Sequence, residues 1–231
     1  MRRLTVATAL FVLTGLLAPA TSFAQQSLNV YVGGFVPKGE DARDRRDVLW
    51  NNLDFLAFDI KDFHGGTAGA EYLVGLNEFI DAGLGVGLYK RTVPSVYADL
   101  VNRNGAEIEQ DMKLRMVPFT ATVRFLPFGR SAGLQPYIGG GVAIINYRYS
   151  EAGEFVDFTD NSVFRDSFVG SGTATGPTVL GGVRVRLGAW DLGGEVRWQK
   201  AKGDLPAGRG FAGEVIDLGG WNYLATVNIH F

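Results

Sequence analysis

The chain has 231 residues, with 22 lysines and arginines against 24 aspartates and glutamates, and it contains no cysteine. This near-balanced charge gives no reason to expect a nucleic-acid partner, and the lack of cysteine excludes disulfides and thiolate metal sites. Glycine is the compositional outlier, since 32 residues are glycine, about twice the usual share of ~7%. The glycines fall among alternating apolar residues, where a helix would not tolerate them, so an all-β fold is expected.

The first 24 residues have the three parts of a secretory signal peptide. Arg2 and Arg3 form a basic start, residues 4–17 are apolar, and Ser22 and Ala24 place small residues where a signal peptidase cleaves. We therefore expect residues 1–24 to be removed and residues 25–231 to form one domain. A retained N-terminal membrane helix is the alternative. No later stretch of the sequence reaches the ~20 consecutive apolar residues of a spanning helix.

Alternating apolar and polar residues recur along the rest of the chain. This period of two predicts strands near residues 27–36, 67–77, 81–93, 107–126, 134–150, 174–188, 190–202 and 217–231. Short turns at 78–80, 127–133 and 188–190 alternate with long polar connections at 37–66, 94–106, 151–173 and 203–216. An up-and-down sheet puts the short turns at one end and the long connections at the other, as in outer-membrane barrels. The predicted fold is therefore an all-β, eight-stranded antiparallel up-and-down transmembrane β-barrel, monomeric and located in the cell outer membrane.

The two faces of most predicted strands differ in polarity, with apolar residues outside and charges inside. This distribution inverts that of a soluble barrel, as a lipid environment requires. The predicted outward residues are Ala68, Ala70, Tyr72, Val74 and Leu76; Val179, Val183, Val185 and Leu187; Leu192, Val196 and Trp198; and Trp221, Tyr223, Ala225, Val227, Ile229 and Phe231. In residues 134–150, the predicted outward set is Tyr137, Gly139, Gly141, Ala143, Ile145, Tyr147 and Tyr149.

The segment 107–126 changes parity along its length. The apolar residues Ile108, Met112, Leu114 and Met116 are even-numbered, whereas Phe119, Ala121, Val123 and Phe125 are odd-numbered. A one-residue bulge at Val117–Pro118 would put both sets outside, and a bulge is one of the few places where a strand accommodates proline. Without the bulge, Lys113 and Arg115, or Arg124, would face lipid at roughly 2–4 kcal/mol for each cation near the midplane. A bulge is therefore predicted.

The inward positions define a predicted lumen charge network. Its members are Glu71, Arg115, Arg124, Arg184, Arg186, Glu195 and Arg197. Because unpaired charges in a narrow lumen are unfavourable, we expect carboxylates to pair with guanidiniums there. Folding about the turn at 188–190 puts Glu195 opposite Arg184. A structural plug is the favoured interpretation, and a gate or selectivity element is the alternative.

Catalytic signatures are absent from the sequence. His64 and His230 have no serine or aspartate partner at a recognisable spacing, so no catalytic residue, metal or cofactor is predicted. The run from Glu40 to Asp47 mixes charges and is interpreted as a solvated loop, with binding of a cation or of lipopolysaccharide phosphates as the alternative. In residues 151–173, acids alternate with phenylalanines, which indicates a strand extension beyond the membrane or a site for an apolar ligand.

Two stretches carry a resemblance to a known family. The turn and strand at 124–129 (RFLPFG) and 135–142 (QPYIGGGV) resemble the matching segment of OmpW-like barrels. The alternating strand that ends on Phe231 resembles the signal read by the barrel-assembly machinery. The chain is thus similar to the small outer-membrane β-barrel superfamily that includes the OmpA membrane domain, OmpX and OmpW-like proteins. The resemblance implies an assembly signal formed by Tyr223, Ile229 and Phe231.

The same resemblance bears on partners and function. It implies contact with outer-membrane lipid, lipopolysaccharide and the barrel-assembly machinery. It also implies a non-enzymatic protein that passes or binds small hydrophobic molecules. A structural or surface-interaction barrel acting through its long extracellular loops is the alternative, and a lipid-modifying enzyme is the least favoured hypothesis.

Overall fold

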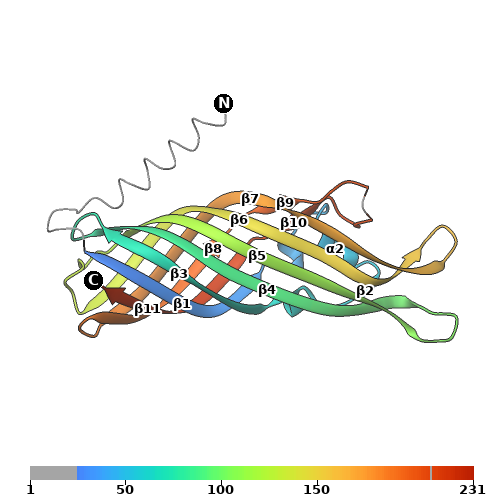
Figure 1. Ribbon diagram of the computed structural model, residues 1–231, viewed down its shortest axis with the longest axis horizontal. Helices are drawn as coiled ribbons and strands as arrows, with labels where there is room; N and C mark the ends of the chain where they lie inside the picture. The colour runs from blue at the N-terminus through green and yellow to red at the C-terminus, as the bar shows by residue number, and fades with distance from the viewer. Residues whose placement is uncertain (1–24, 209) are drawn as a thin grey trace, which may run out of the picture.

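A computed structural model describes residues 25–208 and 210–231, and the predicted signal peptide at 1–24 lies outside them. Within the described residues, eight antiparallel strands close into a ring, which confirms the predicted barrel (Figure 1). In ring order the strands are β1 (Gln26–Pro37), β3 (Gly65–Gly75), β4 (Ile80–Val101), β5 (Glu107–Phe125), β6 (Leu134–Asp157), β7 (Ser162–Arg186), β8 (Trp190–Gln199) and β11 (Gly220–His230). The ring closes between β1 and β11, where Ser27 lies opposite His230. No helix in the described ranges is long and apolar enough to cross a membrane.

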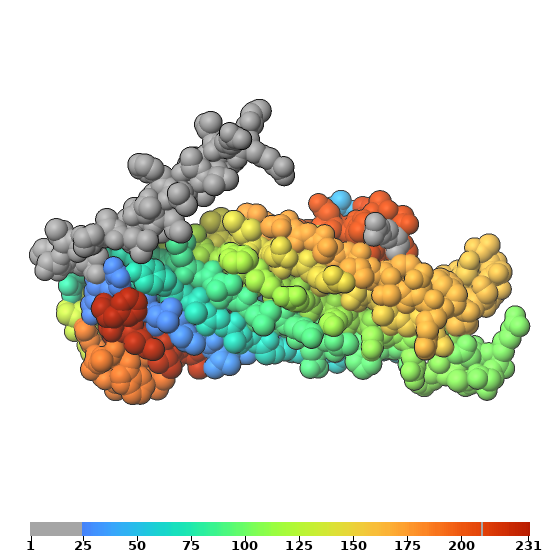
Figure 2. All heavy atoms as spheres, in the orientation of Figure 1, coloured from blue at the N-terminus to red at the C-terminus, as the bar shows by residue number. Residues whose placement is uncertain are grey.

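The connections at the two ends of the barrel differ in length, as the alternation of short and long connections predicted. Short turns at 76–79, 126–133 and 187–189 lie at the same end as the C-terminus. At the other end, β4 and β5 run on to a turn at 102–106, and β6 and β7 run on to a turn at 158–161. Both hairpins project past the rest of the molecule (Figures 1 and 2). The predicted loops 94–106 and 151–173 are therefore mostly strand, and the extension expected as one alternative for 151–173 is observed.

The other long connections cover the outer end of the bore. Residues 38–64 contain η1 (Glu40–Ala42), α2 (Val48–Asn52), β2 (Leu56–Ala57) and η2 (Ile60–Phe63). The strands β9 (Lys202–Asp204) and β10 (Val215–Asp217) pair with each other beside them. Val48, Leu49 and Phe63 are fully buried and pack in one apolar cluster with inward residues of β4 to β6. The outer half of the bore is thus filled mainly by apolar side chains.

The outer wall of the barrel carries an exposed apolar belt. Val86, Phe119, Ile144, Val179 and Tyr223 are between 43% and 53% exposed. The outward sets predicted for β3, β7, β8 and β11 lie on this outer side, whereas Glu71, Arg184, Glu195 and Arg197, which lie between them in sequence, are buried. A continuous apolar surface of this kind is stable in lipid and not in water.

The predicted bulge in β5 is wrong. The pairing of β5 with β6 continues without a shift from Gln110–Gly153 to Phe125–Ile138. Pro118 is instead accommodated by a short gap in the pairing of β5 with β4, whose register is the same on both sides of the gap. A proline lacks an N–H, so it interrupts the ladder locally without moving the strands. Consequently Met112, Leu114 and Met116 point inward, and Lys113 and Arg115 point outward.

The predicted outer face of β6 is also wrong. Its buried residues include Tyr137, Ala143, Ile145, Tyr147 and Tyr149, and its exposed apolar residues are Leu134, Ile138, Val142 and Ile144. Both faces of this strand are apolar because one faces lipid and the other faces the core formed with residues 38–64. Periodicity cannot choose between two apolar faces, and aromatic residues at both ends suggested the wrong one.

Candidate functional site

Four charged residues from three strands meet in the middle of the bore. Glu71 comes from β3, Arg124 from β5, and Glu195 and Arg197 from β8, and their side chains are at most 5% exposed. Arg124 pairs with Glu71, and its Nη2 lies 3.0 Å from Glu195 Oε2. Arg197 Nη2 lies 2.7 Å from Glu195 Oε1 and 3.2 Å from Glu71 Oε2. Because none of these strands is adjacent to another, the pairs of Arg124 with Glu71 and Glu195 and of Arg197 with Glu71 cross the bore.

Neutral side chains add hydrogen bonds to the acids of this central layer. The Thr122 hydroxyl donates to Glu71 Oε1 at 2.7 Å, and the Tyr137 hydroxyl donates to Glu195 Oε2 at 3.0 Å. The Arg124 guanidinium also lies 5.0 Å from the centre of the Tyr137 ring. A buried charge that loses its partner is strongly destabilising, so this balance of acids and cations acts as a unit.

A second charged layer lies nearer the short-turn end. Arg184 Nη2 lies 3.0 Å from Asp81 Oδ2, and its Nε lies 3.6 Å from Asp191 Oδ2. Arg130, from the 126–133 turn, also pairs with Asp81, and His230 Nε2 lies 2.8 Å from Asp191 Oδ2. The contact between Arg184 on β7 and Asp81 on β4 spans the bore.

The predicted lumen residues fall into four places. Glu71, Arg124, Glu195 and Arg197 form the central layer, and Arg184 belongs to the second layer, where it lies opposite Gly193 rather than Glu195. Arg186 lies at the rim, where its Nη1 donates to the Arg130 carbonyl at 3.3 Å. The prediction for Arg115 is wrong, because without the bulge this side chain lies on the outer wall.

The sequence interpretation missed Asp81, Arg130 and Asp191. Asp191 has the same parity as Glu195 and Arg197 on β8, so the period of two could have identified it. Asp81 likewise shares its parity with the buried face of β4. Arg130 lies in a turn, where no periodicity applies.

Asp47 fastens the segment that fills the outer mouth. Arg43 Nη1 donates to Asp47 Oδ1 at 2.9 Å, and both side chains are fully buried. Asp47 also caps α2 by accepting from the amides of Leu49 and Trp50 at 3.0 and 3.2 Å. Its Oδ2 accepts from the Asp217 amide, which links the 38–64 and 200–219 connections. The charged run from Glu40 to Asp47 is therefore not a solvated loop as a whole.

Glu151 is buried without a cation in the outer half of the barrel. Its Oε1 accepts hydrogen bonds from Asn52 Nδ2 and from the Tyr149 hydroxyl, each at 2.7 Å. Burial raises the pKa of Glu151, although both hydrogen bonds act in the opposite direction. Among the described residues, no group of three or more histidines, cysteines or acids is placed to hold a metal ion.

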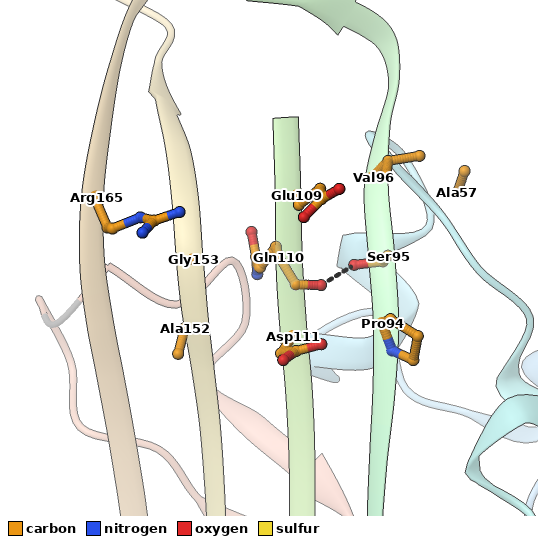
Figure 3. Close-up of a pocket in the computed structure, with 10 residues that line it drawn as sticks. All are labelled: Ala57, Pro94, Ser95, Val96, Glu109, Gln110, Asp111, Ala152, Gly153 and Arg165. Carbon is orange, nitrogen blue, oxygen red and sulfur yellow. Dashed lines mark hydrogen bonds between the residues drawn. The ribbon is translucent and has the colours of Figure 1, made fainter. Parts of the chain in front are cut away.

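A cleft separates the projecting hairpins. The ladder between β5 and β6 ends at Gln110 and Gly153, and a hollow of about 470 Å³ lies there. Figure 3 shows Glu109 on one side of this hollow and Arg165 on the other. Farther out, side chains replace the ladder, since Asn102 Nδ2 donates to Glu154 Oε2 at 3.0 Å. The hairpins are thus held together while a polar cleft stays between them.

The fold is that of solved outer-membrane proteins. The outer membrane protein OprG from Pseudomonas aeruginosa is 14% identical, with a TM-score of 0.53 over 91% of this chain and 96% of that chain. Neisserial surface protein A is 13% identical, with a TM-score of 0.47 over 91% of this chain and 100% of that chain. The outer membrane protein W of E. coli is 12% identical, with a TM-score of 0.45 and the same coverage. No protein-family model and no curated protein matches the sequence. The likeness to OprG shows that the chain has the fold of a small outer-membrane β-barrel. The apolar belt fits a barrel that spans a lipid bilayer.

Proposed function

We propose that this protein is a non-enzymatic outer-membrane barrel with a closed bore, which acts at the cell surface through its projecting hairpins. The observation that carries the proposal is the contrast between the bore and the projecting hairpins. Buried ion pairs cross the bore, whereas the hairpins extend polar and apolar side chains well past the belt. The proposal favours the surface-interaction hypothesis over passage of small molecules through the lumen.

The closed bore has barriers in series. A solute entering from outside would have to displace the apolar segment containing Val48, Leu49 and Phe63, all of them buried. It would then have to break the central layer, where removing one partner of a buried pair typically destabilises a protein by about 3–5 kcal/mol. The layer around Asp81 and Arg184 follows. This arrangement suits a rigid scaffold better than a pore.

The hairpins carry the features of an interaction surface. Val101 and Phe158 are 62% and 63% exposed, and both lie far from the apolar belt. A hollow of about 540 Å³ separates the two turns and is lined by Val101, Asn102, Arg103, Asn104, Asn161, Ser162 and Val163. Residues 98–111 and 152–166 together hold eight acids and two arginines. Exposed apolar side chains in an acidic setting fit a cationic partner surface.

The experiment has two arms. In planar bilayers, the refolded barrel should show no conductance steps, and steady stepwise conductance would contradict the closed bore. In the second arm, cells expressing the barrel should be retained on a surface coated with a cationic protein, and less so on an anionic coat. Val101→Ser with Phe158→Ser should reduce retention, whereas the control Val32→Ser, on the belt, should not. Equal retention by all variants would contradict the role of the hairpins.

A second candidate function rests on an aromatic cluster above the mouth. Phe168 lies 4.6 Å from Phe155 and 6.2 Å from Phe211 between ring centres, and Phe211 lies 5.8 Å from Tyr149. This cluster could bind a small apolar molecule without opening the bore. Phe211→Ala should then weaken the binding of an apolar fluorescent probe such as 1-anilinonaphthalene-8-sulfonate, and an unchanged affinity would exclude this role.

A further inference from the structure

Three basic side chains form a row across the outer wall of the barrel. Lys90 on β4 lies directly opposite Arg115 on β5, and Arg115 lies directly opposite Arg148 on β6. Neighbouring strands are about 4.8 Å apart, so the row places three cations within about 10 Å of backbone. Lys113 lies next to the row on β5, opposite Ser150. These residues and Leu88 line a surface hollow of about 530 Å³.

The row lacks a counter-charge within the described part of the chain. Like charges that face each other across a sheet destabilise it. Arg124, Arg184 and Arg197 inside the barrel each have acidic partners. By contrast, none of the described acids forms an ion pair with Lys90, Arg115 or Arg148. An anion from outside the chain would relieve this repulsion.

The position of the row along the barrel shows which layer of the membrane surrounds it. On β5, the outward residues from Phe125 to Val117 form the apolar side, and Arg115 follows directly. Those eight residue steps span about 26 Å along the strand, or about 20 Å across the membrane at a tilt of ~40°. Leu88, Phe119 and Ile144 lie on the belt side of the row and are about half exposed. The cations therefore lie at the outer limit of the belt, at the level of lipid headgroups.

We propose that Lys90, Arg115 and Arg148 bind the phosphate groups of a phosphorylated glycolipid in the outer leaflet, with its acyl chains along Leu88, Phe119 and Ile144. Guanidinium groups bind phosphate oxygens through paired hydrogen bonds, and the adjacent ammonium adds a point charge. On the side of β7, the next position in the row is Ser171, opposite Arg148. The row therefore has the width of one headgroup and is not a charged ring around the barrel. This assignment is independent of the function proposed for the hairpins.

The test is lipid retention measured by native mass spectrometry on the refolded full barrel in a neutral detergent. The probe is bisphosphorylated lipid A, with phosphatidylglycerol and inorganic phosphate as comparison probes. Losing two charge-assisted contacts in Arg115→Gln with Arg148→Gln should weaken lipid A binding at least about tenfold. The control Arg103→Gln with Arg165→Gln changes the net charge equally on the hairpins and should bind like the unaltered barrel.

Several outcomes would overturn the assignment. Equal lipid A binding by both double variants would show that the row is not the site. Equal binding of phosphatidylglycerol and lipid A would mean that the row binds any anionic lipid and is not selective for a phosphorylated glycolipid. Displacement of lipid A by low concentrations of inorganic phosphate would indicate a free-anion site. Heat-modifiable gel mobility of each variant verifies that the barrel is folded, and Arg115→Lys should restore part of the binding because it retains the charge.

Discussion

Arg124 and Glu195 meet across the bore, with Arg124 Nη2 3.0 Å from Glu195 Oε2, although they belong to strands that are not neighbours in the ring. Contacts of this kind do more than line the lumen. They connect opposite walls, and the two arginines of the central layer balance the charge of its two glutamates. The interior of this barrel therefore contributes to its stability, and the binding surfaces that we propose lie outside it.

Replacing Arg124 with methionine should destabilise the barrel strongly. The substitution leaves Glu71 and Glu195 buried with Arg197 as their remaining cation, and such a loss typically destabilises a protein by about 3–5 kcal/mol. Urea unfolding of the refolded barrel in lipid vesicles measures the change. Arg186→Met is the matched control, because Arg186 lies at the rim and donates only to a carbonyl. Equal losses for both variants would contradict a special role for the central layer.

Replacing Asp47 with alanine should loosen the outer mouth without unfolding the barrel. The change removes the partner of buried Arg43, the cap of α2 and the link to Asp217. We expect residues 38–64 to open locally with a loss of about 3 kcal/mol, and limited proteolysis should cut there first. Asp44→Ala is the control, since the Asp44 side chain is 28% exposed and pairs with the surface residues Lys202 and Arg46. Similar cleavage of both variants would refute the predicted role of Asp47.

The packing of α2 should depend on pH through Glu151. Because burial raises the pKa of Glu151, the folded mouth binds this proton more tightly than the unfolded chain does. The contribution of protonated Glu151 to the stability of the folded mouth is full below the ordinary glutamate pKa of about 4.3. It is lost as pH rises through the raised pKa of the folded state. Amide exchange of α2 against pH measures the effect. The groups that face Glu151 are Asn52 and Tyr149, with the Arg43–Asp47 pair beyond them.

Glu151→Gln should remove this pH dependence, because an amide keeps the hydrogen bonds to Asn52 or Tyr149 without titrating. Glu154→Gln is the control on the same strand and should leave the dependence unchanged. If α2 became better protected as pH rose, or if Glu151→Gln kept the full profile, another group would have to be responsible.

Phe231 should matter more for assembly in cells than for stability in vitro. Its side chain is 69% exposed, and its ring lies 6.3 Å from that of Tyr72, so few buried contacts depend on it. We expect Phe231→Ala to lower the amount of folded barrel in cells and to leave urea unfolding of refolded protein nearly unchanged. Phe125→Ala is the control, because Phe125 is an exposed aromatic residue near the same end. A matching loss of stability in vitro would mean that Phe231 acts through packing.

Some of the site could be predicted, and the rest depended on long-range packing. Glu71, Arg124, Glu195 and Arg197 have inward parity on strands whose faces differ in polarity, so their convergence inside a closed barrel was foreseeable. Their individual partners were not, because ring closure and strand register decide which side chains meet across a bore. The role of Asp47 was equally hidden, since its partners in the 200–219 connection are far away in sequence.

The sequence by itself determined the architecture of this protein. Strands with a period of two, apolar outer faces and alternating short and long connections allow only an up-and-down barrel in lipid. Only the tertiary structure determined which face of β5 and which face of β6 point into the bore. Folding of residues 38–64 into the mouth makes the outer half of the bore apolar, so Met112, Leu114 and Tyr149 point inward. Lys113 and Arg115 then point outward without entering the apolar belt, because the strand has already passed the belt at their level.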